Sequence, residues 1–417
     1  MMVFLKGLLL LLVLSLLAAC FFSNESAAFT YFSYPYGEKI GSLDARSLSM
    51  GGTGVVFQNN AFALGVNPAC LSEIKNFGVT SSVQVVKVDE DRAFPYHDSF
   101  DSFVGFNTYA MNSHLYGGYA FGVAKNFDQG PIPTIGVAGY PVYDWKYQYH
   151  EEVRDDNDLF VGNNIMEHRG GIYAISVGLA EKVTSWLNLG AALNFLNGDG
   201  QFESKAFGDT IIALDRQEVD CDGMNVNLGA MAQISPRIRL GLTYRSEANL
   251  DGTAKLFSKS SLSPDSSRKL ELTYPYSIAM GVEYRPRNDL TARLHFDVEF
   301  TKWSHFQDAA NDTLEFDDVW QFSGGLEHRF FLGYPFRFGF RYQPSYQDKE
   351  VTTTAVTFGT GFSLEKFHID FGGEVGTRSW RWTDLFPESY YGGVEREGKD
   401  KVKESLLRAM VSIDYQF

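Results

Sequence analysis

The first candidates for chemistry in this sequence are histidine and acidic side chains at short spacing. His295 and Asp297 would share one face of a strand, as a base and its orienting acid do in a hydrolase. A hydrolase also needs a nucleophile beside that base, and no Gly-x-Ser-x-Gly motif occurs. Asp155, Asp156 and Asp158 supply oxygen ligands of the kind that a divalent cation prefers, but we interpret this run as a solvated acidic loop. We therefore expect no enzyme, no metal and no cofactor.

The cysteines and the overall charge exclude further classes. Cys70 and Cys221 have no histidines at metal-ligand spacing, and the sequence leaves open whether they pair in an oxidising compartment. The chain has 417 residues and a formal charge of −15. Phosphate binding needs clustered Lys and Arg, so we exclude nucleic acid as a partner.

The N-terminus predicts export. Residues 1–28 have a short positive start to Lys6 and an apolar run from Gly7 to Leu17, which is typical of a signal peptide. Two cleavage sites remain open: an ordinary site after Ala28, or a lipoprotein-type site before Cys20 that would leave this cysteine acylated. No later stretch reaches the ~18 apolar residues of a membrane helix.

Residues 29–75 are predicted to form a compact plug, or hatch. The glycines Gly51, Gly52 and Gly54 permit backbone angles that other residues avoid, and Asn67-Pro68-Ala69 predicts a turn. Such a segment would fold inside a cavity better than it would pair in a sheet. The Asn-Pro-Ala turn is either an element that shifts on substrate binding or a fixed hydrogen-bonded turn.

Residues 76–417 alternate between apolar and polar side chains. Leu294, Phe296 and Val298 alternate with Arg293, His295 and Asp297 in one of several such segments. Soluble sandwiches also alternate, but short joins such as 235–236 and 365–366 separate longer loops here, as in outer-membrane barrels. We expect an all-β transmembrane antiparallel barrel of about 14 strands, near 76–88, 101–109, 115–125, 169–181, 186–198, 219–234, 237–249, 269–285, 289–303, 314–329, 334–345, 353–364, 367–379 and 404–417.

Three segments resemble the FadL/TodX-type family of long-chain fatty acid and hydrocarbon transporters. Residues 272–306 end in the motif that contains Thr301, Trp303 and Ser304, and residues 224–254 resemble the family's Gly-x-Thr/Ser-Tyr-Arg-Ser strand. Residues 45–71 resemble its plug segment, although Cys70 replaces the common glycine after Asn-Pro-Ala. The resemblance implies a fourteen-stranded barrel with an N-terminal hatch in the outer membrane of a Gram-negative-type bacterium.

The resemblance also implies uptake of long-chain fatty acids or other hydrophobic small molecules, with lateral release through the barrel wall into lipid. The strand 115–125 is our candidate for the gap, because Gly117, Gly118 and Gly122 are small; they would alternatively make room for the plug. We expect no nucleic acid partner and a monomer in contact with outer-membrane lipid. The alternative is a non-transporting barrel that acts as a secretion adaptor or adhesion protein.

Capture of the substrate is expected at the outer loops. The long segment 126–168 is interpreted as an aromatic loop suited to an acyl chain, and its aromatic side chains would alternatively pack the loop itself. A fatty acid carboxylate would need a cation, although charges inside a barrel usually pair with one another. The candidate substrate-binding residues are Phe127, Tyr143, Trp145, Tyr147 and Arg154.

Overall fold

The computed structural model describes residues 36–100, 102–127, 133–155, 157–258, 264–286, 292–330, 333–393 and 398–417. The predicted signal peptide and its two cleavage sites lie outside these residues. None of the described helices is long and apolar enough to cross a membrane.

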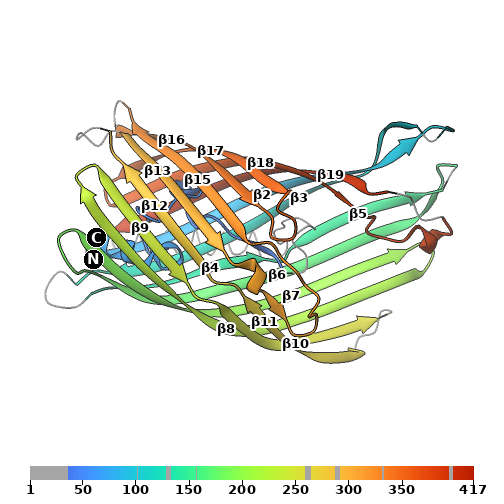
Figure 1. Cartoon of the computed structure of the whole chain (residues 1–417), viewed down its shortest axis with the longest axis horizontal. Helices are drawn as coiled ribbons and strands as arrows, with labels where there is room; N and C mark the ends of the chain where they lie inside the picture. The colour runs from blue at the N-terminus through green and yellow to red at the C-terminus, as the bar shows by residue number, and fades with distance from the viewer. Residues whose placement is uncertain are drawn as a thin grey trace.

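One antiparallel sheet closes on itself to form the wall (Figure 1). It has fourteen barrel strands, as predicted, several of them interrupted into two pieces. Closure is made by the last strand and the first, which pair from Lys401 opposite Ala93 to Gln416 opposite Gly78. The strands are β2 (77–97), β3 (103–125), β4 with β5 (134–144 and 147–154), β6 (160–182), β7 (187–207), β8 (211–235), β9 with β10 (238–245 and 248–258), β11 with β12 (266–274 and 277–284), β13 with β14 (292–301 and 307–308), β15 (319–329), β16 (335–344), β17 (352–364), β18 (367–382) and β19 (400–416).

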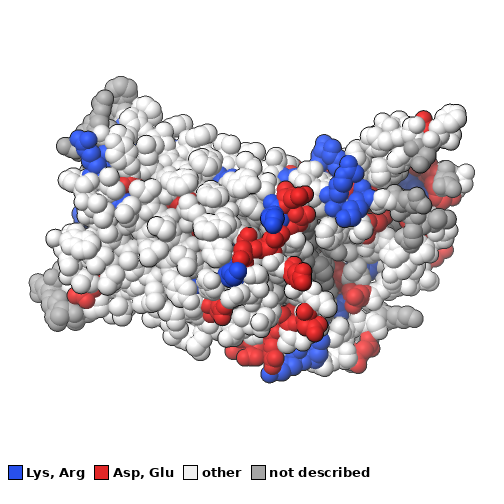
Figure 2. All heavy atoms as spheres, in the orientation of Figure 1, with Lys and Arg blue, Asp and Glu red and all other residues white. Residues whose placement is uncertain are grey.

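The predicted inside and outside faces are confirmed. On β13, Leu294 and Phe296 are about two-fifths exposed, at 43% and 42%, whereas His295 and Asp297 are buried. Atoms of uncharged residues dominate the half of the barrel near the short turns, and charged residues gather over the other half (Figure 2). An apolar outer band of this kind is what contact with hydrocarbon requires.

The strand bounds differ from the prediction mainly at the long-loop end. The expected break between the strands 101–109 and 115–125 is wrong, because the single strand β3 runs through both segments. The expected loop 126–168 is also wrong, because it contains the true third strand, β4 with β5, and the start of β6. Strands β7 and β8 likewise continue through most of the segment between the expected strands 186–198 and 219–234.

Residues 36–74 fill the inside of the barrel. They form the short strand β1 (Glu38–Lys39), the helices α2 (Ala45–Leu48) and α3 (Ala63–Val66), and the 3-10 helix η2 (Pro68–Glu73). Leu48, Met50, Phe62, Leu64 and Leu71 are fully buried. This segment, which we call the hatch, therefore has its own apolar centre packed against the lumen side of the wall.

Candidate functional site

Ion pairs tie the hatch to many strands of the wall. Arg46 binds Glu327 of β15 at 3.1 Å, and Arg239 of β9 binds Glu73 at 3.2 Å. Lys39 pairs with Glu299 of β13. Glu38 binds Arg378 of β18 at 3.0 Å. A charge in this interior is stable only with its partner in place, so these pairs specify how the hatch sits.

Side chains of the wall also form hydrogen bonds with backbone groups of the hatch. Asp297 Oδ2 accepts hydrogen bonds from Gly54 N and Val55 N at 2.7 and 3.0 Å. Arg245 donates to Gly65 O at 2.6 Å. Buried N–H and C=O groups need partners, so the irregular hatch backbone depends on these wall side chains. The lumen-facing Asp297 therefore anchors the hatch.

The predicted hatch glycines differ in their roles. Gly51 and Gly52 have φ of 75° and 84°, the left-handed region that favours glycine. A Cβ on Gly51 would also lie 2.2 Å from Phe340 O, so no side chain fits there. Gly54 has no positive φ, and its contribution is the N–H given to Asp297.

The Asn-Pro-Ala segment is a hydrogen-bonded turn. Asn67 Oδ1 accepts from Ala69 N at 3.1 Å, and Asn67 Nδ2 donates to Val55 O at 2.7 Å. Pro68 follows as the first residue of η2. The neighbouring Cys70 has no positive φ, so the residue that replaces the common glycine is not strained. Cys70 and Cys221 are both free and buried.

An aromatic cluster lies at the long-loop side of the hatch. Trp303 of the predicted motif stacks on Tyr346, with ring centroids 3.8 Å apart. Tyr274 O–H donates to Tyr36 O at 2.7 Å. Thr301 is the last residue of β13, and Ser304 N donates to Asp318 Oδ1 at 3.0 Å, so the motif forms the break between β13 and β14. The cluster consists of Tyr36, Tyr143, Tyr274, Trp303, Phe306, Phe316 and Tyr346.

Beside this cluster lies a cavity of about 380 Å³, which we call the outer pocket. This volume is within the range of small-molecule sites, about 300–1,000 Å³. Its lining is largely apolar and comes from the hatch, the β4–β5 turn and strands β7, β8, β11 and β14. The residues are Tyr36, Trp145, Phe202, Gln217, Val219, Arg268, Leu270, Leu272, Asp308, Ala310 and Asn311.

The outer pocket has a cation at one end. Along β11, Arg268, Leu270 and Leu272 face the pocket in turn, so the guanidinium lies toward the long-loop end. Among the described residues, no carboxylate forms an ion pair with Arg268. The pocket's carboxylate, Asp308, is engaged by Tyr36 O–H at 2.9 Å and lies opposite Leu272, deeper in the barrel. Arg268 was not among the predicted binding residues, because the expected strand begins one residue later, at 269.

The hydrogen-bonded wall is broken between the second and third strands. β3 pairs with β4 only from Lys125 to Phe121, while its pairing with β2 continues to Phe103. Within the described residues, β3 has no backbone ladder to β4 or β5 beyond Phe121. β4 instead turns at Pro141, with a bulge before Tyr143, and pairs with β1 of the hatch. Pro141 has no N–H to give to a ladder, which suits a strand that leaves its neighbour.

Side chains lie along the edges of this break. At the long-loop side, His150 N of β5 donates to Asn112 Oδ1 of β3 at 2.8 Å. Toward the lumen, a small cavity of about 80 Å³ lies between the hatch and the wall. Tyr140, Pro141 and Val142 line this cavity. Trp145 and Tyr36, which line the outer pocket, are joined by a hydrogen bond of 3.2 Å from Trp145 Nε1 to Tyr36 O. Pocket and break therefore share the β4–β5 turn.

The predicted gap residues lie on the strand that borders the break, not on the strand that bends. β3 keeps an unbroken register with β2 from Ala110 to Lys125, so Gly117 and Gly118 introduce no kink. A Cβ on Gly122 would lie 2.6 Å from Ala61 Cβ of the hatch. This glycine makes room for the hatch, which was the alternative reading of the small residues.

The predicted outer-loop capture site is wrong in its placement. Tyr143, Trp145 and Tyr147 are buried inside the barrel, because they lie in or between β4 and β5. Phe127 is at the other end, near the turn where Asn126 N bonds Asn76 O. Arg154 is at the outer tip, where it pairs with Glu152 and donates to Asp158 O at 2.8 Å.

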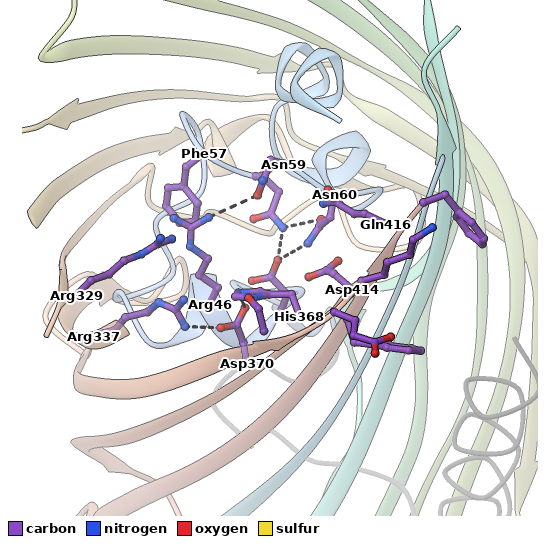
Figure 3. Close-up of a pocket in the computed structure, with 17 residues that line it drawn as sticks. Arg46, Phe57, Asn59, Asn60, Arg329, Arg337, His368, Asp370, Asp414 and Gln416 are labelled. Atoms are coloured by element: carbon purple, nitrogen blue, oxygen red, sulfur yellow. Dashed lines mark hydrogen bonds and ion pairs between the residues drawn. The ribbon is translucent and has the colours of Figure 1, made fainter. Parts of the chain in front are cut away.

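A polar cavity of about 420 Å³ lies on the short-turn side of the hatch (Figure 3). Arg337 binds Glu327 at 2.8 Å and Asp370 at 2.6 Å, and Arg46 of the hatch shares Glu327. His368 is 3.2 Å from Asp370. Charged and amide groups dominate this lining, so an apolar solute would gain little there.

The fold and the enclosed site define a class: a plugged outer-membrane β-barrel. Residues 172–364 match the model of the outer membrane protein transport protein family (OMPP1/FadL/TodX). Over this segment, which is less than half of its length, the chain is similar to a family of outer-membrane transport channels, and its barrel fold places it in the Gram-negative outer membrane.

Solved structures show the same fold at low identity. A Pseudomonas aeruginosa FadL homologue is 13% identical, with a TM-score of 0.68 over 91% of this chain and all of its own. The P. putida toluene transporter TodX is 16% identical, with a TM-score of 0.63 over 90% of this chain and 99% of its own. The Ralstonia pickettii toluene transporter TbuX is 17% identical, with a TM-score of 0.59 over the same shares. No curated protein sequence matches the chain.

Proposed function

We propose that this protein takes up hydrophobic molecules with a single carboxylate, such as long-chain fatty acids, and releases them sideways into the outer membrane. The observation that carries the proposal is the break in the wall beside an apolar pocket. β4 leaves β3 at Phe121, and the same strand leads into Trp145 of the outer pocket. The route is enclosed by one chain, so it needs no second copy.

The outer pocket supports an amphiphile over a neutral hydrocarbon. Leu270, Leu272 and Val219 offer apolar surface, and burial of each methylene contributes about 0.8 kcal/mol. Arg268 offers a charged donor at one end, whereas Asp308 would repel a carboxylate at the other. A bound fatty acid would therefore lie with its headgroup toward the outer surface and its chain toward the hatch.

The two possible exits differ in chemistry. Release toward the periplasm would carry an acyl chain through the cavity lined by Arg337, Asp370 and His368, and past the Arg46–Glu327 pair. Release through the wall leads past Tyr140 and Val142 into lipid. Because apolar surface gains by leaving water and polar groups, the lateral exit is favoured. The pairing of β1 with β4 would link a movement of the hatch to this exit.

A photoreactive fatty acid with a diazirine in its chain tests the route. It is added to cells that express the protein, and the modified residues are mapped by mass spectrometry. We expect labelling at Trp145 and Phe202 in the outer pocket and at Tyr116 and Tyr140 beside the break. Labelling at Phe57 and His368 under the hatch, with none at the break, would show release into the periplasm.

Uptake by cells with and without the protein tests transport itself. Labelled palmitate, hexadecanol and hexadecane are supplied separately, and depletion from the medium is measured. Depletion that depends on the protein supports a transporter, with palmitate favoured. If no hydrophobic compound is depleted, the protein is a secretion adaptor or structural barrel, and the transport proposal is wrong.

A further inference from the structure

Three cations form a surface patch just outside the apolar band. Arg381 lies on β18, and Lys401 and Lys403 lie on the neighbouring strand β19. Arg381 is registered opposite Lys401. We call these three residues the basic outer patch. In the space-filling view, basic atoms gather over the outer ends of β18 and β19, next to the largely uncharged half of the barrel (Figure 2).

The basic outer patch faces away from the lumen. On β19, Val402 and Glu404 are buried, whereas Lys403 is exposed and shares its face with Leu407 and Val411, which are 52% and 38% exposed. That face therefore runs without interruption from the apolar band to the cations. Leu407 to Lys403 is about 13 Å along the strand, or about 10 Å along the membrane normal at a tilt of ~40°. This distance places the cations at the level of lipid headgroups.

The charge of the patch is not neutralised within the part of the chain that the structure describes. No described carboxylate forms an ion pair with Arg381, Lys401 or Lys403. The carboxylate registered opposite Lys403 is Asp91, which leaves an excess of positive charge. Lys87, nearer the apolar band, is bound to Asp89 at 2.7 Å.

An aromatic ring holds two of the cations together. The Arg381 guanidinium lies 5.3 Å and the Lys401 ammonium 5.1 Å from the ring centroid of Phe106 on β3. Two like charges on one ring repel each other, and an anion between them would relieve that repulsion. The cluster is thus arranged for an anionic group that the described residues do not supply.

We propose that the basic outer patch binds the phosphate groups of a phosphorylated glycolipid in the outer leaflet of the outer membrane. The acyl chains of such a lipid would lie along the outward face of Leu407 and Val411, and its phosphates would reach Arg381, Lys401 and Lys403. Guanidinium and ammonium groups form short, charge-assisted hydrogen bonds with phosphate. The chain as a whole carries a charge of −15, so this local excess of cations is specific to one sector of the surface.

The proposal is tested by lipid binding to the purified full-length protein. The triple variant R381Q/K401Q/K403Q is compared with wild type for binding of bis-phosphorylated lipid A in nanodiscs, by native mass spectrometry. A cation near an anionic lipid surface contributes roughly a fivefold change in affinity, so the additive loss of three predicts a decrease on the order of a hundredfold. The matched control, R169Q/K182Q/K269Q, removes three exposed cations that already have acidic partners, and should bind as wild type.

Two further arms separate the sources of phosphate and the effects of folding. Wild type should prefer lipid A over its dephosphorylated form, and inorganic phosphate at equal concentration should compete weakly. Competition by inorganic phosphate as strong as by the lipid would indicate a simple anion site and contradict the proposal. Equal lipid A binding by the triple variant, whose barrel remains heat-modifiable on gels, would also refute it. This test does not depend on what the barrel transports.

Discussion

Substitution of Arg268 by glutamine separates recognition of a carboxylate from recognition of an apolar chain. Glutamine keeps hydrogen-bond donors and most of the side-chain length but removes the charge. The guanidinium is the cation of the outer pocket, and no described carboxylate binds it. A hydrogen bond to a charged group contributes about 1.5–3 kcal/mol when buried. Arg268 is only half-buried, so we expect about 1–2 kcal/mol after screening.

That free energy corresponds to a loss of roughly 5- to 30-fold in palmitate affinity. The assay is equilibrium binding of labelled palmitate to the purified protein in detergent, with hexadecanol as the neutral ligand of equal chain length. We expect R268Q to weaken palmitate binding and to leave hexadecanol binding within about twofold. The control is R154Q, which removes a cation that is already paired with Glu152 at the outer tip.

Two outcomes would refute the reasoning. Equal losses for palmitate and hexadecanol would mean that Arg268 shapes the pocket rather than binding a headgroup. An unchanged palmitate affinity would mean that the carboxylate lies elsewhere or that the ligand is a neutral hydrocarbon. A palmitate affinity that falls with rising salt in wild type, but not in R268Q, would independently identify the charge as the cause.

Three other predictions concern the hatch. Gly51→Ala should lower the thermal unfolding midpoint far more than Gly333→Ala. Both glycines have positive φ, but only at Gly51 would a Cβ meet backbone, 2.2 Å from Phe340 O. Similar shifts of the midpoint for the two variants would contradict this prediction. Asp297→Ala leaves Gly54 N and Val55 N without their acceptor, which costs about 1–3 kcal/mol for each buried group. Because the hatch is then held less firmly, single-channel conductance in planar bilayers should rise. The control D312A, at an exposed position, should conduct as wild type does. Burial raises the pKa of the Cys70 thiol, so less thiolate is present at any given pH. Iodoacetamide at pH 8 should therefore label Cys70 only after unfolding. As a control, a cysteine introduced at the exposed position of Ser267 should react at once.

The sequence predicted the strands of the wall correctly where one face of the strand meets lipid and the other meets the hatch or lumen. On β13 and β19, lipid on one side and the hatch or lumen on the other enforce a period of two, so the faces of Leu294 and Asp297 could be read directly. Beyond the membrane the outward face becomes polar, as at Lys403, and the contrast disappears. The end of β7 was therefore placed too early and the start of β8 too late.

The third strand could not be recognised because its environment is unusual. β4 leaves β3 and pairs with β1, so residues 140–145 are buried without alternation. In the sequence, a run of aromatic residues without alternation resembles a loop. The position of Arg268, by contrast, could have been predicted. Arg268, Leu270, Leu272 and Tyr274 keep the period of two, and an earlier strand start would have placed the cation in the lumen.

The hatch shows what a local pattern can and cannot provide. Glycine at positions 51 and 52 predicted special backbone angles, and these occur. The partners that hold the hatch, such as Glu327 for Arg46, are hundreds of residues away, and alternation alone does not tell which inward charge meets which hatch residue. Pairing of this kind requires the closed barrel.

The far-apart partners of the hatch have a consequence for biogenesis. Ala45 N donates to Ser412 Oγ at 2.7 Å, a bond between residues 367 positions apart. The part of the chain that leaves the ribosome first therefore finishes its contacts only after the final strand has arrived. Until then Arg46, Lys39 and Glu38 lack their counter-charges, so an incompletely assembled barrel would hold its N-terminal segment loosely, where periplasmic chaperones and proteases can distinguish it from the finished protein.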